Sequence, residues 1–176
     1  MVREQPLKEC ERCEAINSST GVQCKNRTCK SKFCWIHLKS QRGLRIKPSS
    51  TGFGDGLYTT RRIAPNSRIG TYGGQEMSKA RVDRLYRRED PKYVLCASQK
   101  CVDGRKTNSS AVRYANSARG TGRRNNTRLS TSYAIRAPYT GNDTYPIFQL
   151  RSQNNRSIAA GTELLTSYGG DYTGYN

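Results

Sequence analysis

A tyrosine near the end of the chain is the first residue whose setting suggests chemistry. Tyr168 follows an apolar, strand-like run at 160–167 and precedes the pair Gly169 and Gly170. Glycine lets another backbone or a ligand come close, so a phenol beside such a turn can line a pocket. The segment 113–118, with the sequence Arg-Tyr-Ala-Asn-Ser-Ala, is a second unusual stretch. We interpret the two segments as halves of one site.

A second group of reactive side chains lies near the start of the chain. Residues 1–40 contain five of the seven cysteines and the only histidine. Zinc in structural sites takes four N or S ligands in a tetrahedron, and a close pair supplies two ligands from one turn. The six candidates exceed the need of one ion. Their spacing is Cys10-x2-Cys13-x10-Cys24-x4-Cys29-x4-Cys34-x2-His37.

The residues around four of these candidates resemble small zinc-binding modules. The stretches Arg-Cys, Gly-x-Gln-Cys and Phe-Cys-Trp-x-His are similar to the pattern Cys…Cys-Lys…Cys-x-x-His. The favoured zinc ligands are therefore Cys13, Cys24, Cys34 and His37. Cys10 or Cys29 is the alternative for one member, and a second ion with shared ligands is another. Free thiols in a loosely ordered tail are the structural alternative, although metal binding would supply folding free energy to this segment.

Four blocks in the rest of the chain resemble, in order, the SET domain of protein lysine methyltransferases. Residues 54–58 resemble Gly-x-Gly-Leu-Phe, and 71–74 resemble Glu-Tyr-x-Gly. Residues 113–118 resemble Arg-Phe-Ile-Asn-His-Ser, with 125–126 in place of a later Pro-Asn, and 161–169 resemble Gly-Glu-Glu-Leu-Thr-Tyr-Asp-Tyr-Gly. The resemblance covers about residues 44–172.

This resemblance implies a site for S-adenosylmethionine beside a channel for a lysine side chain. The implied cofactor-binding residues are Gly54, Asp55, Gly56, Tyr93, Asn116 and Ser117. The implied channel walls are Tyr72, Tyr114 and Tyr172, and the implied catalytic phenol is Tyr168. Ser117 stands where the family has a histidine, which implies weaker cofactor binding. Thr166 stands at the family's inner aromatic position, which implies extra room beside the amine.

The chemistry of methyl transfer suits these residue types. The reaction is an in-line displacement by a neutral amine, yet a lysine has a reference pKa of about 10.4. Burial among aromatic rings beside a cationic sulfonium favours the neutral form. Alignment of the two reactants contributes roughly 7–11 kcal/mol, so orientation by Tyr168 and backbone carbonyls matters more than acid–base strength.

Short strands are expected to position these residues. The predicted strands are 44–47, 56–60, 68–72, 93–96, 133–137, 146–151 and 163–168, separated by Gly, Asn and Ser. One helix is predicted at about 77–88, with Met77, Ala80, Leu85 and Tyr86 on one face. Cys96 lies in an apolar run and is predicted to be a core side chain. Glu163 is predicted to be structural, in an ion pair with a nearby arginine, and Arg113 is also predicted to be structural.

The predicted fold is mainly β with little helix, in two parts. Residues 1–40 form the Cys/His-rich zinc-binding module, and residues 41–176 form the SET-like methyltransferase domain. The resemblance implies several small sheets and a knot-like threaded C-terminal segment in the second part.

The charge of the chain points to polyanions. The formal net charge is +18, from 31 Lys and Arg against 13 Asp and Glu. Such a field attracts nucleic acid first, then anionic membranes and acidic peptides. The stretch 119–126, Arg-Gly-Thr-Gly-Arg-Arg-Asn-Asn, is predicted to be an exposed loop that either binds phosphates or is a solvated face. No run reaches a membrane-spanning length and no apolar signal region follows Met1, so we expect an intracellular protein whose clustered cysteines bind metal.

Three functions remain in view. The leading hypothesis is an S-adenosylmethionine-dependent protein-lysine N-methyltransferase that acts on a basic protein, such as a histone tail or nucleosome. The first alternative is a catalytically weak SET-like, zinc-stabilised chromatin or nucleic-acid binding module, and the second is a plain zinc-stabilised DNA- or RNA-binding protein. We expect DNA contacts through surface charge, no membrane partner, a monomer or homodimer, and a nuclear or chromatin location, in a host nucleus if the protein is viral.

Overall fold

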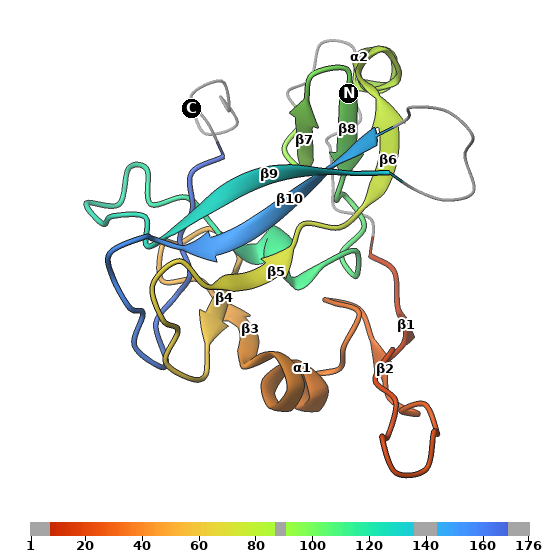
Figure 1. The fold of residues 1–176 in the computed structure, drawn as a ribbon, viewed down its shortest axis with the longest axis vertical. Helices are drawn as coiled ribbons and strands as arrows, with labels where there is room; N and C mark the ends of the chain where they lie inside the picture. Colours follow the sequence, from red (N-terminus) through yellow and green to blue (C-terminus); the bar gives the residue numbers. More distant parts are fainter. Residues whose placement is uncertain (1–7, 87–90, 136–143, 169–176) are drawn as a thin grey trace.

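Antiparallel strands dominate the computed structural model, which describes residues 8–86, 91–135 and 144–168. These residues form ten short strands, two α-helices and one 3-10 helix (Figure 1). The prediction of a mainly β fold with little helix is confirmed. No helix in the described part of the chain is both long and apolar enough to span a membrane.

The strands group into four small antiparallel sheets, whose orders are β1-β2, β3-β4, β5-β10-β9 and β6-β8-β7. The strands are β1 (Glu11–Arg12), β2 (Arg27–Thr28), β3 (Leu44–Pro48), β4 (Asp55–Thr59), β5 (Arg68–Thr71), β6 (Gln75–Ser78), β7 (Val94–Ala97), β8 (Lys100–Asp103), β9 (Thr127–Ile135) and β10 (Thr144–Ser152). The helices are α1 (Trp35–Arg42), α2 (Lys79–Tyr86) and the 3-10 helix η1 (Ala111–Tyr114).

The long β9–β10 pair crosses the middle of the molecule (Figure 1). The β6-β8-β7 sheet and α2 lie above it in this view, and β3, β4 and α1 lie below it. A loop therefore needs to travel only a short way from any sheet to reach the central region, where the sequence motifs meet.

Most predicted strands are confirmed, but the last one is wrong. The predictions at 44–47, 56–60, 68–72, 93–96 and 146–151 match β3, β4, β5, β7 and β10. The prediction at 133–137 covers only the end of β9, which begins at Thr127. In the predicted strand at 163–168, the sole pairing is an isolated bridge from Glu163 to Tyr58. The apolar pattern there reflects burial of Leu164 and Leu165 without membership of a sheet, and Leu164 belongs to the main hydrophobic cluster.

The predicted helix is in the right position, but some of the residues predicted for its buried face are exposed. Helix α2 lies within 77–88, and its buried residues are Val82 and Tyr86, which are four positions apart. Leu85, which was predicted to face the core, is 58% exposed. Met77 is buried but belongs to β6, so the core under α2 is shared between a strand and a helix.

Cys96 is not the core residue that the sequence predicted. It is exposed, and its sulfur is bonded to that of Cys101 on the paired strand β8. Cys96 and Cys101 lie directly opposite each other in the register of β7 and β8, so their side chains share one face of this sheet. Cys101 is the member of the pair that lies in the core, at 0% exposure.

Helix α1 connects the cysteine-rich region to the main core. The sequence predicted no helix here, and the predicted boundary between residues 40 and 41 falls inside α1. Leu38 of α1 is buried in the main hydrophobic cluster with Leu57, Leu150 and Leu164. Burial of one such leucine stabilises a fold by roughly 1.5–3 kcal/mol, so α1 is held mainly through this side chain. Gly43 ends the helix in the left-handed conformation, at a φ of 65°.

Candidate metal centre and cofactor pocket

Three thiols and one imidazole form a compact cluster in the N-terminal region. The ligand atoms of Cys13, Cys24, Cys34 and His37 all lie within 4.8 Å of one another. The Nδ1 atom of His37 is 3.3 Å from the Sγ of Cys34 and 3.6 Å from that of Cys13. A set of three sulfurs and one nitrogen fits tetrahedral zinc. The four residues are the set favoured from the sequence, and they can hold a metal ion such as zinc.

The local structure explains how these ligands converge. Cys34 is the N-cap of α1 and His37 lies in the first turn of that helix, so the two side chains share a face. Cys13 follows β1 directly, and its backbone N–H donates to the carbonyl of Asn26 at 2.8 Å. The backbone N–H of Cys24 donates to the carbonyl of Ala15 at 2.7 Å, which fixes the fourth ligand.

The alternative ligands Cys10 and Cys29 are excluded from this centre. Their sulfur atoms are bonded to each other in a disulfide, so neither sulfur is available to a metal. The prediction that one of them replaces a favoured ligand is wrong. The sequence could not pair them, because six closely spaced candidates allow many arrangements.

The two buried thiols of the cluster differ in acidity. Burial disfavours the Cys34 thiolate, but hydrogen bonds from the backbone N–H of His37 and from Asn26 outweigh it and lower the pKa of Cys34 to about 6. Burial raises the pKa of Cys13. A bound dication would favour the thiolate form of both cysteines, because metal ligation requires deprotonated sulfur.

A cavity of about 450 Å³ is lined mainly by the larger part of the chain, together with Lys8, Cys29 and Lys30 of the cysteine-rich region, and it collects the sequence motifs. Its walls come from the Gly-rich turn before β4, the segment before β7, η1 and the C-terminal segment. Seven predicted site residues line it: Gly54, Asp55, Tyr72, Tyr93, Tyr114, Asn116 and Tyr168. A volume of this size is typical of pockets for small molecules.

The two segments singled out from the sequence lie side by side in this cavity. The hydroxyl of Tyr168 donates to the carbonyl of Ala115 at 2.5 Å. The backbone N–H of Thr166 donates to the carbonyl of Asn116 at 2.9 Å. The side-chain amide of Asn116 donates to the carbonyls of Phe53 and Asp55 at 3.3 and 3.1 Å. Asn116 therefore joins the Gly-rich turn to the segment that holds Tyr168.

Hydrogen bonds fix the aromatic walls of the cavity. The hydroxyl of Tyr72 donates to the carbonyl of Tyr93 at 2.7 Å, and the hydroxyl of Tyr114 donates to that of Thr107 at 3.0 Å. The guanidinium of Arg113 stacks on the rings of Tyr93 and Tyr114, at 4.3 and 4.9 Å from their centroids. Burial raises the pKa of Tyr114 despite this nearby cation. Arg113 lines the cavity, although from the sequence it was predicted only to be structural.

Two of the predicted site residues, Gly56 and Ser117, do not line this cavity. Gly56 is buried, and a Cβ atom at its position would overlap Oε1 of Glu163, so its missing side chain makes room for that carboxylate. Ser117 lines a neighbouring hollow of about 430 Å³, which it shares with Tyr168 and the basic stretch 119–126. Tyr172 lies outside the described residues. Thr166 is fully buried, and its hydroxyl has no hydrogen-bond partner among the described residues.

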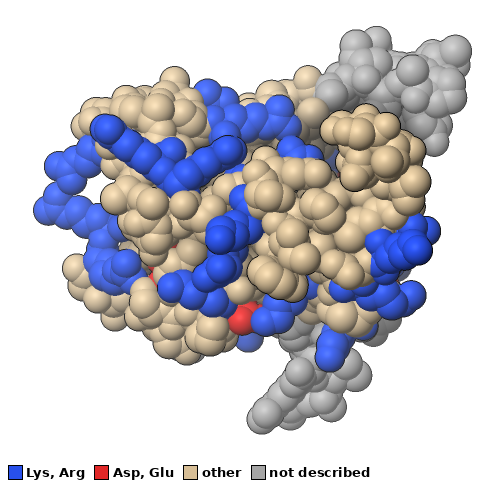
Figure 2. Space-filling model, turned by 90° about the horizontal axis from the view of Figure 1, so that it is seen from below, with Lys and Arg blue, Asp and Glu red and all other residues tan. Residues whose placement is uncertain are grey.

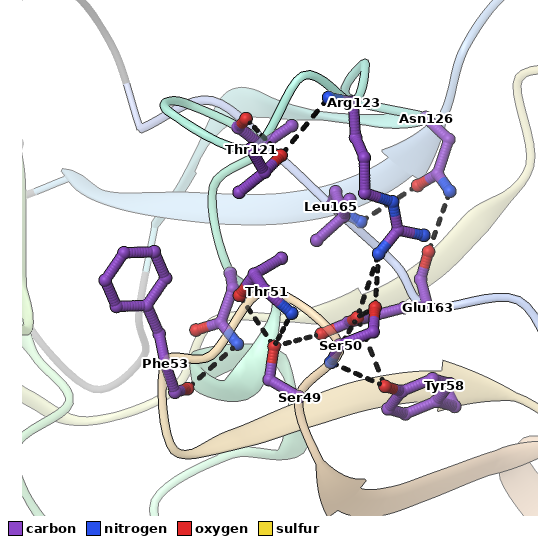
Figure 3. Close-up of polar contacts among 12 residues, drawn as sticks. Ser49, Ser50, Thr51, Phe53, Tyr58, Thr121, Arg123, Asn126, Glu163 and Leu165 are labelled. Atoms are coloured by element: carbon purple, nitrogen blue, oxygen red, sulfur yellow. Dashed lines mark hydrogen bonds and ion pairs between the residues drawn. The ribbon is translucent and has the colours of Figure 1, made fainter.

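Glu163 anchors a polar network beside the cavity (Figure 3). Its side chain is 0% exposed and accepts hydrogen bonds from Ser49 at 2.6 Å, the backbone of Ser50 at 3.0 Å and Tyr58 at 3.2 Å. Arg123 lies 3.4 Å away as an ion-pair partner, which confirms the predicted pairing with an arginine. Burial alone would raise the pKa of Glu163, but the hydrogen bonds outweigh it and lower that pKa.

Comparison with known proteins adds no identification. No family model matches the chain, and no curated protein matches its sequence.

Proposed function

We propose that this protein is an S-adenosylmethionine-dependent protein-lysine N-methyltransferase of the SET type, with a zinc-stabilised N-terminal module. The proposed substrate is a basic protein, such as a histone tail or a nucleosome. One observation carries the proposal: motif residues from several separate segments line one cavity, and the hydroxyl of Tyr168 is held there by the Ala115 carbonyl at 2.5 Å.

The residues of the cavity are compatible with the cofactor. Gly54 has a φ of 55° and carries no side chain, so its backbone can approach a ligand closely. The carboxylate of Asp55 forms an ion pair with Lys30 at 2.7 Å, so these two charges largely offset each other at the wall. Gly54, Asp55, Tyr93 and Asn116 would hold the cofactor, which supplies an activated methyl group when bound. Asn116 would act mainly by holding the Gly-rich turn in place.

The aromatic walls would prepare the substrate lysine. Rings of Tyr72, Tyr93 and Tyr114 exclude water, and burial disfavours the ammonium form of an amine. The nearby guanidinium of Arg113 acts in the same direction, since like charges lower the pKa of an amine. The lysine proton leaves to solvent before attack, and Tyr168 orients the neutral amine. A phenol oxygen can both donate and accept, so Tyr168 can contact the amine while it is held by Ala115.

Methyl transfer from labelled cofactor to core histones and to free basic peptides tests this proposal. We expect transfer by the parent protein and a loss of about 100-fold in Tyr168→Phe, since removal of one aligned hydrogen-bonding group at a reaction centre costs roughly 10²–10³. Tyr133→Phe is the matched control, because Tyr133 is 58% exposed on β9. If Tyr168→Phe transfers methyl groups as fast as the parent, Tyr168 is not the catalytic phenol.

A second candidate function is a catalytically weak SET-like module that binds chromatin or nucleic acid. The net charge of +18 and the metal cluster favour it. A thermal-shift titration separates the two candidates. Stabilisation by S-adenosylmethionine supports the enzyme, whereas no shift together with steeply salt-dependent DNA binding supports the module.

A further inference from the structure

A larger hollow lies away from the Tyr168 cavity. Its volume is about 720 Å³, and it shares no lining residue with that cavity. Helix α1, the ends of β3 and β4, the 59–64 stretch and β5 form its walls. We call this hollow the arginine groove. No sequence motif pointed to it, because its residues come from separate short segments.

Four arginines make the groove positively charged. Arg42 comes from α1, Arg61 and Arg62 follow β4, and Arg68 begins β5; all four are exposed. No Asp or Glu among the described residues lines the groove. A fifth cation, Lys32, is already engaged by Glu11 and Glu14 at 3.3 Å each.

Three of the four guanidinium groups contact neutral partners. Arg62 donates to the hydroxyl of Ser157 at 3.1 Å, and Arg68 donates to that of Thr71 at 2.8 Å. Arg42 lies over the ring of Phe33, 4.6 Å from its centroid. In the described part of the chain, none of the four forms an ion pair. Their charge is therefore oriented along the groove and not neutralised by carboxylates.

The lining favours phosphate groups over nucleotide bases. Phe33 is the sole aromatic among the described lining residues, and the guanidinium of Arg42 covers its ring. Single-stranded nucleic acids are usually held by stacking of bases on exposed aromatic rings, and such a platform is missing among these residues. Ser67 and Ser109 also line the groove, and serine hydroxyls can donate to phosphate oxygens. The floor also includes apolar side chains, such as those of Leu38, Ile63 and Val112.

We propose that the arginine groove binds the phosphodiester backbone of duplex DNA without reading its base sequence. Duplex DNA carries one negative charge for each ~1.7 Å of axis, so a row of unpaired arginines can meet several phosphates at once. Guanidinium groups bind phosphates in a bidentate manner. The face of the molecule seen from below is rich in Lys and Arg and poor in Asp and Glu (Figure 2).

The proposal is tested by fluorescence anisotropy with a labelled ~20-bp duplex, a length that covers about two turns. The variants are Arg61→Gln/Arg62→Gln from one wall and Arg42→Gln/Arg68→Gln from the others. The slope of log K against log salt is negative, and each lost phosphate contact reduces its magnitude by about 0.9. Each pair of substitutions should therefore make the slope shallower by about 2. The matched control is Arg81→Gln/Arg84→Gln on α2, where both arginines are exposed.

Equal losses in the two groove pairs and in the α2 pair would overturn the proposal, because binding would then follow total charge alone. A poly-glutamate peptide provides the second arm of the experiment. If the groove pairs weaken binding of this peptide and leave DNA binding unchanged, the groove serves an acidic protein and the proposal fails. The assay needs neither cofactor nor methyl acceptor, so its outcome is independent of the proposed enzymatic activity.

Discussion

Glu163 shows how a single residue holds the candidate site together. Its buried carboxylate joins the turn at Ser49 and Ser50 to the segment that leads to Tyr168. The resemblance to SET domains and the arginine-rich surroundings were enough to predict a structural carboxylate paired with an arginine. The serine donors could not be predicted, because they lie more than a hundred positions earlier in the chain and hydroxyl side chains are common throughout it.

Replacement of Glu163 by glutamine tests this network and its dependence on pH. The pKa of Glu163 lies below its ordinary value of 4.5, so the ionised form stabilises the fold above that value. This contribution disappears as the pH falls through the lower pKa of the folded state. At pH 7 we expect Glu163→Gln to lower the free energy of unfolding by about 1–3 kcal/mol, since the surrounding donors lose a charged acceptor.

Urea unfolding of Glu163→Gln and of the parent at pH 7 and at pH 3 measures this difference. The difference in the free energy of unfolding between the two proteins should be smaller at pH 3 than at pH 7. Glu11→Gln is the control, because Glu11 has a side chain that is 53% exposed and forms a surface ion pair. A difference that stays constant over this range would mean that the pKa of Glu163 is the same in the folded and the unfolded protein, which would contradict the lowered pKa.

At the scale of elements, helix α1 shows what pattern reading misses. The stretch Trp35–Arg42 has no strong apolar stripe, and one buried side chain, Leu38, attaches it to the core. Its position is set by Cys34 and His37, which meet the other ligands at the metal cluster. Tertiary contacts of this kind override local propensity. The false strand at 163–168 has the opposite cause: Leu164 and Leu165 are buried outside any sheet, and their burial produces the apolar pattern of a strand.

Metal removal should therefore disturb α1 as well as the cysteine-rich region. We expect about one zinc per chain, and we expect a chelator to lower the melting temperature and the helical circular dichroism signal. Cys34→Ser should lose the zinc. Cys10→Ser/Cys29→Ser should keep it, because these two sulfurs are bonded to each other and not to the cluster. Elemental analysis of the purified proteins distinguishes the two variants, and loss of zinc from the disulfide pair would contradict this ligand set.

At the scale of the whole molecule, charge and function have to be reconciled. A protein with a net charge of +18 repels a cationic peptide at long range, although its proposed substrate is basic. The charge could be read from composition alone, whereas the arginine groove could not, since it depends on how α1, β4 and β5 meet. DNA attached to a basic protein substrate would remove the conflict, because the DNA would be attracted to the proposed enzyme and would bring the lysine with it.

This reasoning predicts opposite salt dependences for two substrates of the proposed enzyme. Between ~20 and ~200 mM salt, transfer to a free basic peptide should rise, because the Debye length shrinks and repulsion is screened. Transfer to nucleosomes should fall over the same range, because salt weakens phosphate contacts. A peptide with the same target lysine and neutral flanks is the control, since salt effects on cofactor or metal would appear there too. Initial rates of labelled methyl transfer measure all three. If transfer to the free basic peptide falls as steeply as transfer to nucleosomes, net charge does not oppose peptide binding and DNA is not needed to deliver the substrate.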